Sequence, residues 1–308
     1  MGSGRWSDSD WASYSTTHVK SARTVDDIYK SRGLATELDP SGVKIRESCD
    51  SEDNPNSNAI IVALDVTGSM GMVLDTVARE GLSTLATEIY DRKPITDPHI
   101  MFMGIGDCHA HDRAPLQITQ FEADIRIAEQ LTKLYLERGG GGNDYESYAL
   151  AWYFAAMHTR IDCFEKRQKK GYLFTIGDEE PTPYLSAADI ERVLGYKPQQ
   201  DRFSTQDLYT MASRYYNVYH LMVEEGSHFR TDPDGVVRAW TDVLGQNAIR
   251  LADHTKVAEV IVSIIQVAEG ADNKDVSASW DGSTGLVVAK AINGLAKTAV
   301  DDNGIVVL

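Results

Sequence analysis

Uninterrupted apolar runs of strand length recur along this chain and constrain its fold more than any other feature. The clearest runs cover residues 59–64, 100–105, 172–176 and 218–223. A strand with one face in water alternates apolar and polar side chains, whereas a strand covered on both faces has a continuous apolar sequence. These runs therefore predict the central strands of a parallel sheet.

Segments with helical spacing follow these strands. After the first run, apolar residues recur every three or four positions from Val73 to Ile89, and after the second run the same spacing connects Ile125 with Leu134. Further elements are expected as a helix over 145–160, a strand over 248–251 and a helix over 257–265. Alternation of strands and helices predicts βαβ crossovers. The expected fold class is therefore α/β, a doubly wound, mostly parallel sheet with helices on both faces.

The chain divides into three segments by composition. Residues 1–57 are rich in Ser, Asp, Thr and Asn, and we expect a polar N-terminal arm with at most short elements. Residues 58–270 contain the predicted strands and helices and form the α/β domain. Residues 271–308 form a C-terminal tail, which either docks on the domain or binds a partner.

Charge and cysteine content exclude several classes of protein. The chain has 308 residues, with 46 acidic and 30 basic side chains and a net charge of −16. Such a surface repels a phosphate backbone, so no nucleic-acid partner is expected. No apolar run approaches the roughly 18 residues that span a membrane, so no membrane partner is expected either. Three widely spaced cysteines and the lack of a secretory leader predict a reducing location, the cytoplasm.

Oxygen-bearing side chains follow the first predicted strand. Asp65, Thr67 and Ser69 alternate along the turn that ends this strand, and Gly68 relieves the backbone there. Ligands in open α/β sheets bind at the carboxyl ends of the strands. Carboxylate and hydroxyl oxygens are the donors that Mg²⁺, Mn²⁺ and Ca²⁺ prefer. The alternative is that these side chains only cap the helix that follows.

Two more loops at predicted strand or helix ends carry oxygen donors. Four glycines at 139–142 precede Asn143 and Glu146, and Asp178 follows the strand over 172–176. Three such loops from separate parts of the chain favour a cation site over three independent caps or turns. The predicted ligands are Asp65, Thr67, Ser69, Asn143 and Asp178.

The segment from Asp65 to Ser69 resembles a known family. It matches the D-x-[ST]-x-S signature of the metal-ion-dependent adhesion site in von Willebrand factor A domains. The sequences around Asp107, Asn143 and Asp178 resemble a bacterial and bacteriophage subgroup of this family. The resemblance implies that Asp65, Thr67, Ser69 and Asp178 surround a divalent cation, most often Mg²⁺. The family usually has Gly-Gly-Thr in the second loop, whereas this chain has Asn143; either Asn143 or Glu146 takes the place of that Thr.

The function implied by this resemblance is metal-dependent protein binding without catalysis. An Asp or Glu of a partner protein would complete the coordination of the cation. One alternative is a structural component of a phage or phage-derived assembly, in which the cation only stabilises the fold; the chain would then lie within that particle. The sequence predicts neither the partner nor the oligomeric state.

Two further chemistries compete for parts of the same sequence. Asp-x-Thr-Gly-Ser after a strand also resembles the phosphorylated-aspartate loop of haloacid dehalogenase-like phosphatases, with Asp65 as nucleophile and Lys169 or Lys170 as the required lysine. The segment Asp107-Cys-His-Ala-His-Asp112 offers thiol and imidazole donors for a transition metal, although its spacing is not a standard zinc pattern. His220 lies inside an apolar strand and is expected to be a core residue.

Overall fold

A six-stranded sheet forms the centre of the computed structural model, which describes residues 4–110, 112–137, 143–295, 299–300 and 306–307. Its strands, in spatial order, are β12 (Ala248–Leu251), β11 (Tyr216–Val223), β7 (Gly171–Gly177), β2 (Asn58–Asp65), β3 (Pro98–Ile105) and β4 (Leu116–Ile118). All neighbours are parallel except β4, which runs antiparallel to β3 at one edge. This confirms the predicted α/β class with a mostly parallel sheet.

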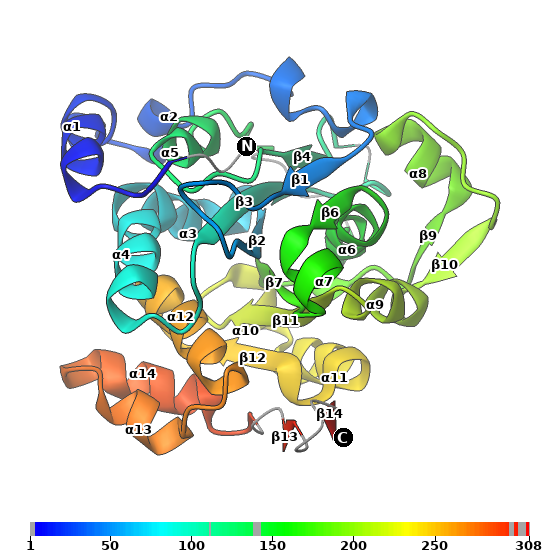
Figure 1. Ribbon diagram of the computed structural model, residues 1–308. Helices are drawn as coiled ribbons and strands as arrows, with labels where there is room; N and C mark the ends of the chain where they lie inside the picture. The colour runs from blue at the N-terminus through cyan, green and yellow to red at the C-terminus, as the bar shows by residue number, and fades with distance from the viewer. Residues whose placement is uncertain (1–3, 111, 138–142, 296–298, 301–305, 308) are drawn as a thin grey trace.

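Helices cover both faces of the sheet, as Figure 1 shows. One face packs against α3 (Gly71–Thr76), η4 (Val77–Gly81), α4 (Leu82–Arg92), α5 (Arg126–Leu131) and α12 (Val257–Ala268). The other face packs against α6 (Tyr148–Met157), α7 (Asp162–Arg167), α8 (Ala187–Leu194), α9 (Thr205–Ser213), α10 (Ser227–Thr231) and α11 (Pro233–Leu244). Since β2, β3 and β7 are buried along their whole length, their continuous apolar sequences follow from this double cover.

The helix predicted over 145–160 is shorter than expected. It covers Tyr148–Met157 as α6, and strand pairing takes the residues at both ends. Before α6, β5 (Tyr145–Glu146) pairs in parallel with β8 (Glu180–Pro181). After it, β6 (Thr159–Ile161) pairs in parallel with β1 (Arg46–Ser48) of the N-terminal arm. Pairing partners far away in the sequence therefore decide where this helix begins and ends.

The N-terminal arm contributes to the core of the α/β domain. It forms α1 (Asp8–His18), α2 (Val25–Ile28), η1 (Thr36–Leu38), η2 (Pro40–Gly42) and β1. Val19, Ile28, Tyr29 and Leu38 are buried in the same cluster as residues of β2 and α12. The Tyr29 hydroxyl donates a hydrogen bond of 3.0 Å to the carbonyl oxygen of Leu74. The arm is thus packed against the helix that follows the first strand.

Removing the Tyr29 ring should destabilise the whole protein. We expect Tyr29→Ala to lower the free energy of unfolding by about 3–5 kcal/mol, as for other buried aromatic rings. Tyr29→Phe is the matched control, because it keeps the ring and loses the hydrogen bond, at a cost of about 1 kcal/mol. Urea denaturation measures both values. Equal, small losses in the two variants would show that the arm is not part of the folded core.

The C-terminal segment continues the packing on α12. Helices α13 (Asn273–Ala278) and α14 (Gly282–Ile292) contact α12, and the indole of Trp280 donates a 2.8 Å hydrogen bond to the Ser263 hydroxyl. Farther on, β13 (Ala299–Val300) and β14 (Val306–Val307) form a two-stranded antiparallel sheet. Ile305 and Leu308 lie outside the described residues. No helix in the described part of the chain is both long and apolar enough to cross a membrane.

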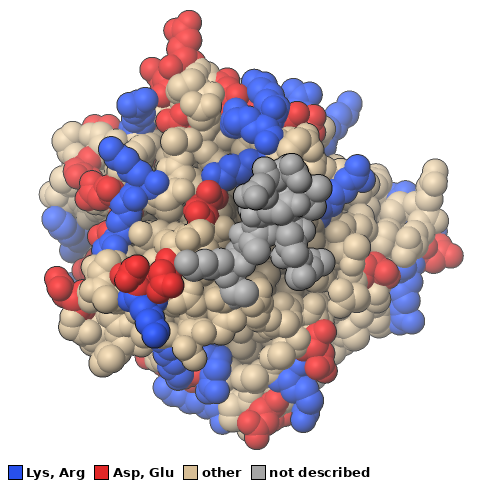
Figure 2. Space-filling view, turned by 60° about the horizontal axis from the view of Figure 1, so that its bottom comes forward, with Lys and Arg blue, Asp and Glu red and all other residues tan. Residues whose placement is uncertain are grey.

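The remaining elements are short and lie in loops. They are η3 (Gly68–Met70), β9 (Tyr184–Ser186), β10 (Arg202–Ser204), η5 (Gly245–Asn247) and η6 (His254–Lys256). On the face of the molecule shown in Figure 2, acidic and basic side chains are interspersed. Glu224 lies 2.8 Å from Lys290 of α14. Several acidic side chains are also buried, at the ends of the central strands.

Candidate metal centre

The carboxyl ends of β2, β3 and β7 lie side by side at one edge of the sheet, the edge formed by the ends of the strands and not by an outer strand. Asp65, the last residue of β2, is paired with Ile105 of β3, and the preceding Leu64 is paired with Ile176 of β7. Asp107 and Asp178 follow these two neighbouring strands closely in sequence. All three aspartates are fully buried. The fold thus brings to one place three acidic groups that are more than forty residues apart in sequence.

Asp65 and Thr67 are held together in the first loop. Oδ1 of Asp65 accepts hydrogen bonds from the backbone N–H of Thr67 at 2.8 Å and from its hydroxyl at 2.6 Å. Oδ2 accepts a third bond, of 3.1 Å, from the hydroxyl of Tyr148 on α6. The carboxylate is therefore fixed in direction by groups from two different elements.

Ser69 joins the first loop to the third. Its hydroxyl donates a 2.8 Å hydrogen bond to Oδ1 of Asp178, 109 residues away. Oδ2 of Asp178 accepts a 3.0 Å bond from the backbone N–H of His228, at the start of α10. Four of the five predicted ligands therefore form two contacting pairs at the strand ends, Asp65 with Thr67 and Ser69 with Asp178.

The fifth predicted ligand, Asn143, contacts a different aspartate. Its amide nitrogen donates a 2.6 Å hydrogen bond to Oδ2 of Asp107, and its own Oδ1 is buried with no hydrogen-bond partner in the described structure. The alternative ligand, Glu146 of β5, is 1% exposed, and among the described residues its Oε2 has no partner either. The glycines at 139–142 lie outside the described residues.

Five carboxyl groups are buried at this edge of the sheet with little positive charge to balance them. They belong to Asp65, Asp107, Glu146, Asp178 and Glu179. In the described part of the chain, Glu179 alone among them has a basic side chain as ion-pair partner, the imidazole of His228 at 3.0 Å. Buried carboxylates are stable only when paired, protonated or bound to a metal ion. The five carboxyl groups therefore need protons or a bound cation to be stable in this position.

The pKa values of these groups follow from their crowding. Burial raises the pKa of Asp65 to about 7, and the nearby Asp178 carboxylate adds to the rise. Burial also raises the pKa of Glu179 to about 9 and that of Glu146 to about 11, and in both cases Asp65 is the strongest neighbouring charge. In the absence of a cation, protons hold part of the cluster neutral near pH 7.

The donor set fits a hard divalent cation. Carboxylate, hydroxyl and amide oxygens surround the ends of the three strands, and two of these oxygens, Oδ1 of Asn143 and Oε2 of Glu146, are buried acceptors without a donor. A bound cation supplies the positive charge that such acceptors lack. Nitrogen and sulfur donors, which transition metals prefer, contribute no side chain to the pairs around Asp65 and Asp178.

The position of the Asp178 carboxylate depends on the absence of a side chain at Gly226. A Cβ atom at Gly226 would overlap the carboxyl group of Asp178, although the backbone of Gly226, at φ −67°, accepts any residue. We expect Gly226→Ala to displace Asp178 and to weaken cation binding by about 10-fold or more, the usual cost of disturbing a ligand's support. Gly71→Ala is the matched control, because a Cβ there meets no atom. Equal cation affinities by calorimetric titration would contradict a ligand role for Asp178.

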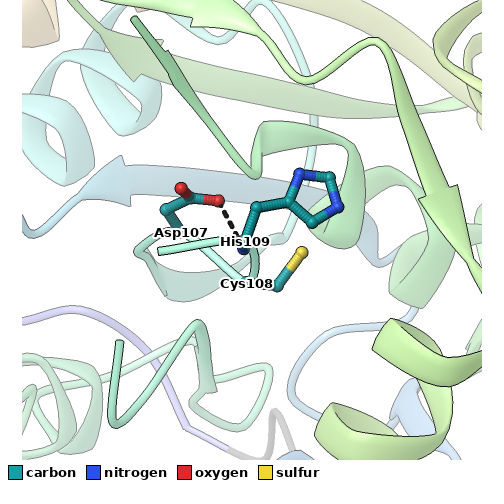
Figure 3. A group of neighbouring side chains, drawn as sticks. All are labelled: Asp107, Cys108 and His109. Atoms are coloured by element: carbon teal, nitrogen blue, oxygen red, sulfur yellow. Dashed lines mark hydrogen bonds between the residues drawn. The ribbon is translucent and has the colours of Figure 1, made fainter. Parts of the chain in front are cut away.

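The predicted transition-metal segment shows a different arrangement. Donor atoms of Asp107, Cys108 and His109 lie within 4.8 Å of one another, and Figure 3 shows the Asp107 carboxylate bonded to the backbone N–H of His109. However, burial raises the pKa of the Cys108 thiol to about 12, so it carries its proton at neutral pH. The imidazole of His109 lies 3.2 Å from Asp189 on α8. His111 is outside the described residues. These three residues are therefore less suited to binding a transition metal than their residue types alone predict.

Two residues of the site were not among the predicted ligands of the main cation. Asp107 was predicted only as part of the transition-metal segment, although it follows the end of β3 in the way that Asp178 follows the end of β7. Tyr148, on α6, is fully buried. Its hydrogen bond to Asp65 could not be predicted from spacing. His220 is buried as expected, and it stacks on Trp240 with ring centroids 3.5 Å apart.

Comparisons with known proteins give similarities only among solved structures. No protein-family model and no curated protein matches this chain. Two structures of the pilus adhesin SpaC from Lactobacillus rhamnosus GG align with 70% and 71% of this chain and 31% and 32% of their own, at 10% and 11% identity and TM-scores of 0.47 and 0.46. A von Willebrand factor type A structure from Catenulispora acidiphila aligns with 70% of this chain and 44% of its own, at 14% identity and a TM-score of 0.39. The chain thus spans less than half the length of these proteins, and similarities this distant carry no conclusion about its function.

Proposed function

We propose that the edge formed by β2, β3 and β7 binds a divalent cation and uses it to bind a protein. Asp65, Thr67, Ser69 and Asp178 hold the cation, which is Mg²⁺, with Mn²⁺ and Ca²⁺ as alternatives. Asn143 or Glu146 provides the donor from the second loop. The observation that supports this most strongly is the group of five buried carboxyls, of which one has a basic partner, His228, in the described structure.

The exposure of the site residues supports a protein ligand. Asp65 and Asp178 are fully buried, whereas Ser69 and Asn143 are partly exposed, so the site is open to solvent on the side of these two residues. When bound, the cation supplies a Lewis-acidic position for an outside oxygen. An Asp or Glu side chain from a partner protein has the charge and the donor atom for that position. Binding of the partner is then switched by the cation.

Partner capture in the presence and absence of the cation tests this function. We expect the immobilised full chain to retain its partner in Mg²⁺, and to release it in EDTA and after Asp178→Asn. Asp242→Asn removes an equivalent charge from an exposed position on α11 and should retain the partner. A partner that stays bound in EDTA would show that the interaction does not pass through the cation. The scaffold function, in which the cation only stabilises the fold, would then be preferred.

The phosphotransferase alternative receives less support from the fold. Lys169 and Lys170 precede β7, so they lie at the amino end of a strand whose carboxyl end carries Asp178. Lys169 forms a 2.9 Å ion pair with Glu269 after α12. Both lysines are therefore at the opposite edge of the sheet from Asp65, where a phosphate on that residue would lie beyond their reach. Trapping of a beryllofluoride adduct at Asp65 would restore this alternative.

A further inference from the structure

We propose that a second divalent cation binds next to the first, between Asp107, Asn143 and Glu146. This inference rests on the proposed function, because it extends the same edge of the sheet. The first cation belongs to the pairs Asp65–Thr67 and Ser69–Asp178. The second has its own donors, which come from the end of β3 and from the segment that leads into α6.

Asp107 is held as a metal ligand would be. Its Oδ1 accepts bonds from the backbone N–H of His109 at 2.8 Å and from the Ser147 hydroxyl at 3.0 Å, and its Oδ2 accepts the 2.6 Å bond from Asn143. Its backbone N–H donates a 2.8 Å bond to Asp112. These bonds fix the carboxylate direction without providing a positive charge. Supporting hydrogen bonds of this kind orient metal ligands in other proteins.

The acceptor atoms beside Asp107 have no donors among the residues that the structure describes. Oδ1 of Asn143 and Oε2 of Glu146 are both buried and unpartnered, and the Glu146 side chain as a whole is 1% exposed. A buried acceptor without a donor lacks the hydrogen bonds that it makes with water in the unfolded chain. Glu146 directly precedes Ser147, whose hydroxyl donates a 3.0 Å hydrogen bond to Asp107, and in this proposal its carboxylate is shared by the two cations.

Backbone pairing places Glu146 between the loops that carry the other ligands. Pairing of β5 with β8 includes hydrogen bonds of 3.2 Å from Glu180 N–H to the Asp144 carbonyl and from Thr182 N–H to the Glu146 carbonyl. On the other side, the N–H of Ser147 donates a 3.3 Å bond to the Gly106 carbonyl. Glu146 is thus tied to the loop after β7 and to the loop after β3. This position is set by the backbone and does not depend on a side-chain rotamer.

The donors of the second cation are separate from the two pairs that hold the first. Glu179, the fifth buried carboxyl, lies beside His228 and belongs to neither set. The donors assigned to the second cation are the carboxylate oxygens of Asp107 and Glu146 and the amide oxygen of Asn143. Oxygen donors of this kind bind Mg²⁺, Mn²⁺ or Ca²⁺.

Manganese binding to the full-length chain tests the inference. We expect the metal-free protein to bind two Mn²⁺ ions in equilibrium dialysis, and their electron paramagnetic resonance spectrum to show spin coupling, because ions that share a carboxylate lie about 4 Å apart. Asp107→Asn and Glu146→Gln should each reduce the number bound to one and remove the coupling. Asp178→Asn should also leave one ion, at the other centre. Asp144→Asn, which removes an exposed charge from the same segment, should leave two coupled ions.

The outcomes separate this inference from the proposed function. One Mn²⁺ ion in the unaltered protein, lost in Asp178→Asn and kept in Asp107→Asn, would contradict the second centre and leave the first intact. No bound ion at all would contradict both. Circular dichroism of each variant establishes that it is folded. An electron paramagnetic resonance spectrum of the unaltered protein that shows no spin coupling between bound Mn²⁺ ions would contradict the inference without any variant.

Discussion

In the absence of a cation, raising the pH from about 5 to about 8 should destabilise this protein by at least 2 kcal/mol. The buried carboxyls of Asp65, Glu146 and Glu179 have raised pKa values in the folded state, mainly because burial disfavours their charged forms. In the unfolded chain these groups titrate near pH 4. Between these values the folded protein holds protons that the unfolded chain has released, so the free energy of unfolding falls as the pH rises. One such group contributes about 1.4 kcal/mol per pH unit.

The titration range distinguishes the three groups. The contribution of Asp65 is present below about pH 4 and is lost as the pH rises to about 7. The losses from Glu179 and Glu146 continue to about pH 9 and about pH 11. Urea denaturation of metal-free protein at several pH values measures the total. Saturating Mg²⁺ should remove most of the dependence above neutral pH, because the cation replaces the protons.

A matched pair of variants identifies the source of this pH dependence. Glu146→Gln replaces a side chain that must hold a proton to stay buried by a neutral one of the same shape, so the metal-free variant should be more stable than the unaltered protein at about pH 8. Glu191→Gln changes an exposed glutamate on α8 and should leave the curve unchanged. A metal-free protein whose stability rises steadily from about pH 5 to about pH 8 would contradict the crowding of carboxylates at the strand ends.

Asp65→Asn and Asp178→Asn should each abolish cation binding at the first centre. Each substitution replaces a charged ligand by a neutral amide of the same shape, and both side chains are fully buried. Disturbing only the supporting groups of a metal ligand costs about 10-fold to 100-fold in affinity, so loss of a ligand charge should cost about 100-fold or more. Calorimetric titration with Mg²⁺, Mn²⁺ and Ca²⁺ measures the change.

Two controls separate loss of a ligand from a general loss of negative charge. Asp242→Asn changes the net charge by the same amount at an exposed position of α11 and should bind as the unaltered protein does. Tyr148→Phe keeps all charges and removes the 3.1 Å hydrogen bond to Asp65, so a smaller loss, of about 10-fold, is expected. If Asp65→Asn and Asp178→Asn bind cations as tightly as Asp242→Asn, these residues are not ligands.

The central strands were predictable because strands that are covered on both faces have continuous apolar sequences. Each of the four main runs lies within a strand of the sheet, at β2, β3, β7 and β11. The antiparallel edge strand β4 was not predicted, since three residues give too short a pattern. The ends of α6 were also wrong, because β5 and β6 pair with residues 35 and 113 positions away, and local spacing contains no information on such pairs.

The candidate site, too, was predicted from the sequence only in part. Asp65, Thr67, Ser69 and Asp178 were predicted from their place after strands, and the structure brings them into two contacting pairs. Asn143 was predicted with them, but it contacts Asp107, which spacing alone did not select. The burial of Glu146 depends on the pairing of β5 with β8. Its role could therefore be proposed from the sequence only as an alternative to Asn143.

The most direct test of the cation site is a crystal structure of the protein grown with Mn²⁺, with anomalous diffraction recorded at the manganese edge. We expect a strong anomalous peak in contact with the Ser69 hydroxyl and the Asp178 carboxylate, at the carboxyl ends of β2 and β7. No peak within coordination distance of these two side chains, in crystals of protein that is saturated with Mn²⁺, would contradict the proposal that this edge of the sheet is a metal centre.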